Sequence, residues 1–333
     1  MAFHDIIGQE RALLILQRAL AESHLPHAYL FHGPTGVGKR FTAVQFVKAL
    51  YCSGAALDAC DVCLACRKIA ANNHPDVMMV VPDGATMKIE QIRAVQRRLS
   101  YKPYEDQRTT VILESCELLS PPAANALLKT LEEPRTNALL LLLTGKKAAL
   151  PLTIVSRCQL VPFRPLPVPH LCTILERQGV DPATAALAAS LSEGQLDRLH
   201  NTEISELLAM RQSAYHVLQN MLQARGITSF LQARKLASKR EQCEELFRWL
   251  ALLCRDLTIL TVAPSTPLYN QDLYADLTPF SQCVPLDHLL QMFDLIQQLR
   301  THLTMNINPQ LLFEQMLVQL QDILAAPRQS SKA

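Results

Sequence analysis

The chain has 333 residues, a formal net charge of +2 and 19% charged residues. A chain of this length can bury two or three hydrophobic cores, so more than one domain is expected. The near-neutral balance excludes a strongly cationic nucleic-acid-binding protein, and any contact with nucleic acid has to come from a local basic patch or from partner subunits.

The N-terminal stretch MAFHDIIGQERALL lacks the basic start and the long apolar run of a signal peptide. The longest apolar run, at about residues 138–143, is too short to cross a bilayer, so we expect no membrane association. Ten cysteines in a chain without an export signal favour thiols and metal ligation over disulfides. We therefore expect a cytoplasmic protein.

Helix-like and strand-like segments alternate from about residue 8 to residue 163. Such alternation predicts an α/β domain in which helices cover both faces of a parallel five-stranded sheet. Short apolar runs are typical of strands buried on both faces. They predict strands at 28–33, 76–81, 109–114, 138–144 and 158–163.

The stretch VPFRPLPVP at 161–169 contains four prolines and suits a linker, because proline cannot continue the interior of a sheet. Long amphipathic helices dominate the later part of the chain. In the last of these helices Asn308 is the predicted N-cap and Pro309 the first helical residue. We expect an α/β domain at 1–166, a small helical domain at 167–203, a larger all-α domain at 204–326 and a disordered tail at 327–333.

Residues 33–39 read GPTGVGK and match the Gly-x-x-x-x-Gly-Lys pattern of a phosphate-binding P-loop. The pattern lies between a predicted strand and a predicted helix, as a P-loop does. Backbone N–H groups around Gly36 and Gly38 and the Lys39 ammonium attract phosphate oxygens in such a loop. A glycine turn without a ligand is the alternative.

Two positions of this nucleotide site depart from the pattern of a hydrolase. Arg40 stands where Ser or Thr would ligate Mg²⁺, which arginine cannot do, and Thr42 lies about 200° further around the helix. The next core strand ends in Glu114 and Ser115, where hydrolases place an Asp-Glu pair, and Ser115 cannot accept a proton from water at neutral pH. Glu117 is a weaker candidate for that role. We expect no ATP hydrolysis, and whether ATP binds stays open.

Four cysteines follow the P-loop helix with the spacing C-x7-C-x2-C-x2-C. Tetrahedral zinc takes four thiolates that converge from a tight loop, so the spacing predicts a zinc module at 52–66. Four protein ligands leave no open position on the metal, so the zinc is expected to be structural; ordinary buried thiols are the alternative. The ligands are Cys52, Cys60, Cys63 and Cys66.

These features, in this order, resemble the bacterial clamp-loader branch of the AAA+ ATPases. The match spans nearly all of residues 4–163, and NINPQLLFEQMLVQL resembles the end of the helical collar in this family. It includes IIGQERALLILQRAL near the start, HPDV at 74–77, NALLKTLEEP at 125–134 and SRC at 156–158. The resemblance implies an AAA+ domain with a zinc-binding insertion, then a helical lid and an all-α collar.

Family members that hydrolyse ATP keep both Gly-Lys-Ser/Thr and the Asp-Glu pair, whereas this chain departs at both places. With SRC retained, it looks like the member that does not turn over ATP but donates an arginine to a neighbour's nucleotide. The resemblance therefore implies that Arg157 is an arginine finger acting in trans; a solvated loop arginine is the alternative. The degenerate nucleotide-binding set comprises Gly33, Gly36, Gly38, Lys39, Arg40, Glu114, Ser115 and Thr144.

The family's lid arginine falls in a Gly-Ser-x-Arg-like stretch, which reads Gly194-Gln195-Leu196-Asp197 here. Asp197 would repel phosphate, although the adjacent Arg198 leaves the charge of this stretch open.

The segment MKIEQIRAVQRRL predicts a helix with an apolar face and a basic remainder. In the resembled ring such helices line a channel that follows duplex phosphates, which gives affinity that is independent of sequence and sensitive to salt. A solvated basic face is an equally good interpretation. The candidate DNA-facing residues are Lys88, Arg93, Arg97 and Arg98.

Three hypotheses follow. The first is an ATPase-inactive subunit of a hetero-pentameric clamp loader within a DNA polymerase holoenzyme, partnered by gamma/tau-type ATPase subunits, a delta subunit, the sliding clamp and primer–template DNA. The second is an active DNA-stimulated AAA+ ATPase subunit of the same loader. The third is a zinc-module nucleic-acid binder with a vestigial ATPase fold, against which the near-neutral charge counts.

Overall fold

The computed structural model describes residues 3–22, 25–55, 57–105, 108–135, 137–197, 204–222, 240–303 and 307–325. They belong to two compact units, Met1–Asn201 and Thr202–Ala333, which we describe separately. The predicted tail at 327–333 and Arg198 lie outside the described residues. Within the described ranges, no helix combines the length and the apolar character needed to cross a membrane.

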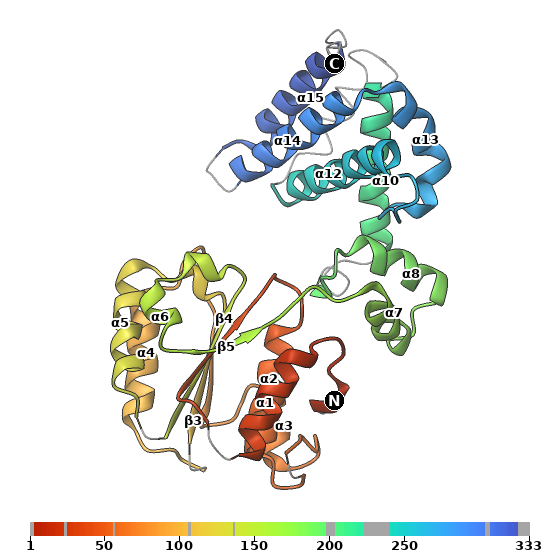
Figure 1. The fold of residues 1–333 in the computed structure, drawn as a ribbon. Helices are drawn as coiled ribbons and strands as arrows, with labels where there is room; N and C mark the ends of the chain where they lie inside the picture. Colours follow the sequence, from red (N-terminus) through yellow and green to blue (C-terminus); the bar gives the residue numbers. More distant parts are fainter. Residues whose placement is uncertain are drawn as a thin grey trace. The chain divides into compact units, whose positions relative to one another are not determined.

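A parallel five-stranded sheet forms the centre of the first unit, in the order β2-β3-β4-β1-β5 (Figure 1). The sheet confirms the predicted architecture, with strand ends that differ from the prediction by one residue at most. The central strands β3 and β4 are buried along their whole length, as their unbroken apolar runs require. The strands are β1 Ala28–His32, β2 Val77–Val80, β3 Thr109–Leu113, β4 Ala138–Thr144 and β5 Gln159–Pro162.

The edge strand β5 contains Pro162, the first proline of the predicted linker. Proline has no N–H to donate to a ladder, and it is tolerated at the edge of a sheet for this reason. The linker is therefore shorter than the proline-rich stretch suggested, because the next helix begins at Val168.

Helices cover both faces of the sheet (Figure 1). One face carries α1 Glu10–Ala21, α2 Lys39–Tyr51 and α3 Leu64–Ala70, preceded by the 3₁₀ turn η1 Phe3–Asp5. The other face carries α4 Ile89–Ser100, α5 Pro121–Glu132 and α6 Leu152–Val155, together with the short turns η2 Cys116–Leu118 and η3 Lys147–Ala149.

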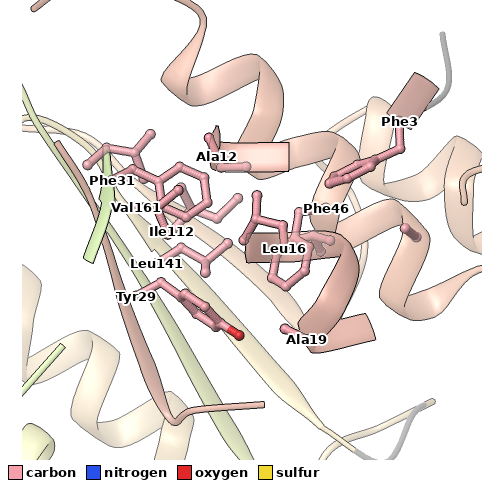
Figure 2. Close-up of a cluster of buried hydrophobic side chains, with 14 of the residues drawn as sticks. Phe3, Ala12, Leu16, Ala19, Tyr29, Phe31, Phe46, Ile112, Leu141 and Val161 are labelled. Carbon is pink, nitrogen blue, oxygen red and sulfur yellow. The ribbon is translucent and has the colours of Figure 1, made fainter. Parts of the chain in front are cut away.

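Alternate residues of each strand enter two separate cores, since successive side chains of a strand point to opposite faces. Figure 2 shows the first core, in which Leu16 of α1 and Phe46 of α2 pack towards Phe31 of β1. The second core brings Leu30 of β1 together with Leu127 of α5. Both cores are fully buried, so the carboxyl ends of the strands are held rigidly at one edge of the sheet.

Two short helices, α7 Val168–Arg177 and α8 Pro182–Leu191, complete the first unit. Asp181 caps α8 by accepting hydrogen bonds from the N–H groups of Ala183 and Thr184, both at 3.1 Å. The chain after α8 returns to the linker, where the N–H of Leu166 donates to the carbonyl of Gly194.

The described part of the second unit is helical, and Trp249 and the Phe247–Phe313 ring pair lie in its core. Asn308 caps the last helix by accepting a hydrogen bond from the N–H of Gln310 at 2.9 Å, which confirms the predicted N-cap. The elements are α10 Ile204–Leu222, α12 Arg240–Val262, η4 Gln271–Leu273, α13 Tyr274–Cys283, α14 Leu286–His302 and α15 Pro309–Ala325.

A fully buried carboxylate, Asp76, joins the start of β2 to the loop after α4. It accepts hydrogen bonds from the N–H groups of Tyr104 at 2.7 Å and Glu105 at 2.8 Å. It also accepts one from Nη2 of Arg98 at 2.5 Å. Because a buried carboxylate needs all of these donors, Arg98 stabilises the fold of the first unit by pairing with Asp76.

We predict that Asp76→Ala lowers the free energy of unfolding of the first unit by about 3 kcal/mol, because it leaves a largely buried guanidinium and two N–H groups without their acceptor. Urea unfolding followed by circular dichroism measures the loss, and hydrogen exchange should place it in α4 and the loop at 101–105. Asp83→Ala is the matched control, since the Lys88–Asp83 pair is exposed and its removal should change little. An equal loss in both variants would contradict the prediction.

Candidate functional site

The P-loop lies between β1 and α2, at the carboxyl edge of the sheet. Gly38 caps α2 with a φ of 90°, and Gly36 has a φ of 75°; both are left-handed conformations that favour glycine. Gly33 is required for a different reason, since a Cβ there would lie 2.3 Å from the carbonyl oxygen of Phe163. The glycines predicted from the sequence therefore do form a P-loop backbone.

Lys39 points back into its own loop. Its Nζ donates a hydrogen bond to the carbonyl of Gly33 at 2.8 Å and another to the carbonyl of Pro34. Burial lowers the pKa of Lys39, and the nearby carboxylates of Glu117 and Asp197 act against that shift. The ammonium that would hold a nucleotide's phosphates thus has acceptors within the chain.

Arg40 forms an ion pair with Glu114, and the distance between its Nε and Oε1 of the carboxylate is 3.1 Å. The Glu114 side chain is only 17% exposed, whereas Arg40 is 63% exposed. Burial raises the pKa of Glu114, Arg40 lowers it and Asp197 raises it. The residue that replaces the metal-binding hydroxyl therefore places its own cation on the carboxylate that would face the metal.

Glu117 reaches the end of the neighbouring strand β4. Its Oε2 accepts a hydrogen bond from Oγ1 of Thr144 at 2.8 Å and one from the N–H of Gly145 at 3.1 Å. Ser115 has a φ of 50° at the start of η2, and this left-handed turn redirects the chain just after β3. The structure thus groups Glu117 with Thr144, a contact that the sequence did not predict; Glu117 was expected only as a weak candidate for the general base.

The segment after α8 lies against the P-loop. The N–H of Leu196 donates to the carbonyl of Gly36, and a Cβ at Gly36 would lie 3.0 Å from Cβ of Gln195. Asp197 follows and adds a negative charge near Lys39 and Glu114. The structure therefore brings the Asp197 carboxylate close to the P-loop, and its expected effect on phosphate stays a prediction.

Gln9 braces the loop from the other side. Its Nε2 donates to the carbonyls of Val37 at 3.2 Å and Arg164 at 2.8 Å, and its Oε1 accepts from the N–H of Arg164. Sequence reasoning missed this role. The only signal in the sequence was a glutamine, which is not a good N-cap, immediately before an amphipathic helix; the structure shows that Gln9 is buried.

The four predicted cysteine ligands come together, with all four Sγ atoms within 4.8 Å of one another. The N–H groups of Cys63 and Cys66 donate to the sulfurs of Cys60 and Cys63, at 3.3 Å and 3.5 Å. The backbone N–H of Cys66 is the main cause that lowers the pKa of Cys63 to about 6. Four sulfurs that converge in this way could hold a metal ion.

The cysteine module is anchored to the P-loop helix. Nζ of Lys48 in α2 donates to Oδ1 of Asp61 at 2.7 Å, and the Lys48 side chain is only 7% exposed. A second tie joins the N–H of Phe3 to Asp58.

Arg157 lies between α6 and the edge strand β5, with a side chain that is 35% exposed. Its Nη2 is 2.8 Å from Oε1 of Glu132, at the end of α5, and its Nη1 donates to the carbonyl of Thr153 at 3.0 Å. Leu152, in the same short helix, is 83% exposed. A partly exposed arginine thus follows a short helix that also carries an exposed apolar side chain.

The predicted DNA-facing set divides into two kinds of residue. Arg93 and Arg97 are exposed on α4. Lys88 is also exposed and pairs with Asp83 at 3.1 Å. Arg98 serves the buried Asp76 and stacks on Tyr104.

A P-loop between the first strand and its helix, on a parallel five-stranded sheet covered by helices on both faces, defines a P-loop α/β protein. The family model described as "DNA polymerase III, delta subunit" matches residues 8–167, and the model for the C terminal of that subunit matches residues 203–322. The chain belongs to the DNA polymerase III delta subunit family that these two models together describe.

Individual relatives agree with this family. DNA polymerase III subunit delta' of Bacillus subtilis is 28% identical over 94% of this chain and 96% of its own length. The delta' subunit of Pseudomonas aeruginosa is 40% identical over 40% of this chain and 41% of its own length. DNA polymerase III subunit tau of Bacillus subtilis is 28% identical over 96% of this chain but only 61% of its own length.

We predict that the stability lost in Arg40→Ala shrinks as the pH falls from about 8 to about 5. Without Arg40, the pKa of Glu114 rises further above its unfolded value, so the folded state is penalised wherever Glu114 is ionised. The loss of stability is therefore present at pH values above the pKa of Glu114 in the folded chain. It disappears below the pKa of Glu114 in the unfolded chain. Melting temperatures of variant and parent across this range measure it, and in a Glu114→Gln background the difference should no longer depend on pH.

Proposed function

We propose that this chain is a non-hydrolysing, delta-prime-type subunit of a DNA polymerase III clamp loader that lends Arg157 to a neighbouring ATPase subunit. The ion pair between Arg40 and Glu114 is the observation that carries the proposal, because it puts a fixed cation where a hydrolase needs a metal ion. The implied partners are gamma/tau-type ATPase subunits and a delta subunit in a hetero-pentamer, the sliding clamp and primer–template DNA.

The loss of ATP hydrolysis is argued from three features of the chain's own site. Arg40 cannot ligate Mg²⁺, and its guanidinium repels a divalent ion brought to Glu114. Lys39 already has two carbonyl acceptors. Asp197 adds a negative charge close enough to Lys39 to influence its pKa. Each feature weakens metal-assisted cleavage, and together they favour a framework role for the P-loop.

The role in trans is argued from the position of Arg157. It lies beside the edge strand β5, so a neighbouring subunit can approach it without displacing the sheet. A guanidinium on a γ-phosphate stabilises the charge that develops as the bond breaks, which is worth about 10³–10⁵ in rate where such fingers act. The exposed Leu152 supplies apolar contact area next to the finger.

The cysteine cluster is proposed to hold a structural zinc ion. Its four sulfurs and their N–H donors suit tetrahedral zinc, and no open coordination position would remain for chemistry. Arg93 and Arg97 are the proposed DNA-facing residues of α4, because their side chains are exposed while Arg98 is committed to Asp76.

We predict that Arg157→Ala in a reconstituted loader lowers the ATPase and clamp-loading rates by about tenfold or more, because the guanidinium that stabilises the developing charge is lost. Lys39→Ala should change either rate little, because this chain's own P-loop does no chemistry. Steady-state ATP turnover with primed DNA and clamp present measures both variants. The reverse order of effects would contradict the proposed division of labour.

We predict that the purified full chain carries about one zinc ion and that Cys60→Ser loses it. Chelation should lower the melting temperature of the parent, since binding energies of about 10 kcal/mol are typical of such sites. Cys283→Ser is the matched control, because this exposed cysteine lies outside the cluster. A parent chain that contains no metal and does not respond to chelator would sink the zinc proposal.

The second candidate is an active, DNA-stimulated ATPase subunit of the same loader, and the position of Glu117 favours it. A carboxylate beside Thr144, close enough to influence the pKa of Lys39, could act as the general base that Ser115 cannot be. The purified chain, assayed alone with DNA and Mg²⁺, separates the two functions. Turnover that Glu117→Gln abolishes would support the second.

A further inference from the structure

The contact between Glu132 and Arg157 has no explanation in the stability of the fold. Glu132 ends α5, where the helix dipole disfavours a carboxylate. Its side chain is 48% exposed and that of Arg157 is 35% exposed. Ion pairs with such exposure contribute little to folding, because solvent screens them and both long side chains lose rotamer freedom. Because Glu132 lies in an unfavourable position and adds little stability, we look for a functional reason for its contact with Arg157.

The geometry of the contact indicates what that reason is. Two nitrogens of the guanidinium are held from the chain's own side, Nη2 by Glu132 at 2.8 Å and Nη1 by the carbonyl of Thr153 at 3.0 Å. A guanidinium is a planar fork of several N–H donors, so two contacts at its end fix the plane of the group. Other donors of the same fork remain directed elsewhere and can meet an acceptor on another molecule.

We propose that Glu132 is the positioning residue for Arg157, holding the guanidinium ready for the triphosphate of a neighbouring subunit. This inference rests on the proposed function. If the Arg157 side chain is ordered before the subunits associate, the conformational entropy that is lost on association is smaller. The pair is also exposed enough for a multiply charged phosphate to compete with the single carboxylate, so the contact orients Arg157 without trapping it.

The test uses the full chain reconstituted with its ATPase subunits, the sliding clamp and primed DNA. Glu132→Ala should lower kcat for ATP by about 5- to 30-fold, the range set by the rotamer freedom of arginine, and leave KM unchanged. Glu132→Gln keeps a neutral acceptor and should fall between parent and Glu132→Ala. Glu133→Ala is the matched control, because it removes the same charge one residue further on and should stay within about twofold of the parent.

A double-mutant cycle makes the test specific to Arg157. In an Arg157→Ala background, Glu132→Ala should cause no further loss, since the residue that it positions is gone. An unchanged or faster rate in Glu132→Ala alone overturns the inference, as does an added loss in the Arg157→Ala background. The melting temperature of Glu132→Ala should match that of the parent. If it does not, the same cycle of rates is measured with Glu132→Gln in place of Glu132→Ala.

The outcome for Arg157→Ala separates this inference from the function on which it rests. Full activity in Arg157→Ala would end the proposed function as well. A strong loss in Arg157→Ala with unchanged rates in both Glu132 variants would leave the proposed function standing and overturn only the role of Glu132.

Discussion

The ion pair between Arg40 and Glu114 occupies the point at which a P-loop protein couples its nucleotide to a metal ion. Arg40 comes from the first turn of α2 and Glu114 from the end of β3, so the pair joins the two elements that a hydrolase uses to grip Mg²⁺. Glu114 is largely buried, and removing its cation would leave a carboxylate in a poorly solvated place. Under the proposed function, the Arg40 guanidinium would stand in place of the metal ion, and the P-loop would keep its backbone shape without hydrolysing a nucleotide.

The same carboxyl edge of the sheet shows how neighbouring groups support that exchange. Glu117 and Thr144 satisfy each other at the ends of adjacent elements, and Lys39 is held by loop carbonyls. Gln9 and the segment around Leu196 clamp the loop from two sides. A loop whose lysine and backbone already have hydrogen-bond partners has little need of a ligand to order it. This agrees with the proposed function, in which the partly exposed Arg157 contributes at another surface.

Much of this arrangement could be predicted from the sequence. The buried apolar runs specified the sheet, the glycines specified the P-loop, and cysteine spacing brought four sulfurs together, because each of these signals is local. The pairs Arg40–Glu114 and Glu132–Arg157 could not be predicted, since each joins positions that are far apart in the chain and depends on side-chain direction. Arg98 could not be assigned from the sequence for the same reason. Its position in the helix indicated an exposed basic face, whereas in the folded chain it donates a hydrogen bond to the buried Asp76.

The edge strand β5 has a consequence for how another chain can meet this protein. An open sheet edge normally invites a further strand, whose backbone would continue the ladder. This edge is only four residues long and ends in Pro162, which cannot donate to an incoming backbone. A neighbour on this side is thus steered away from β-augmentation and has to engage side chains, so recognition there depends on residue identity and not on generic amide pairing.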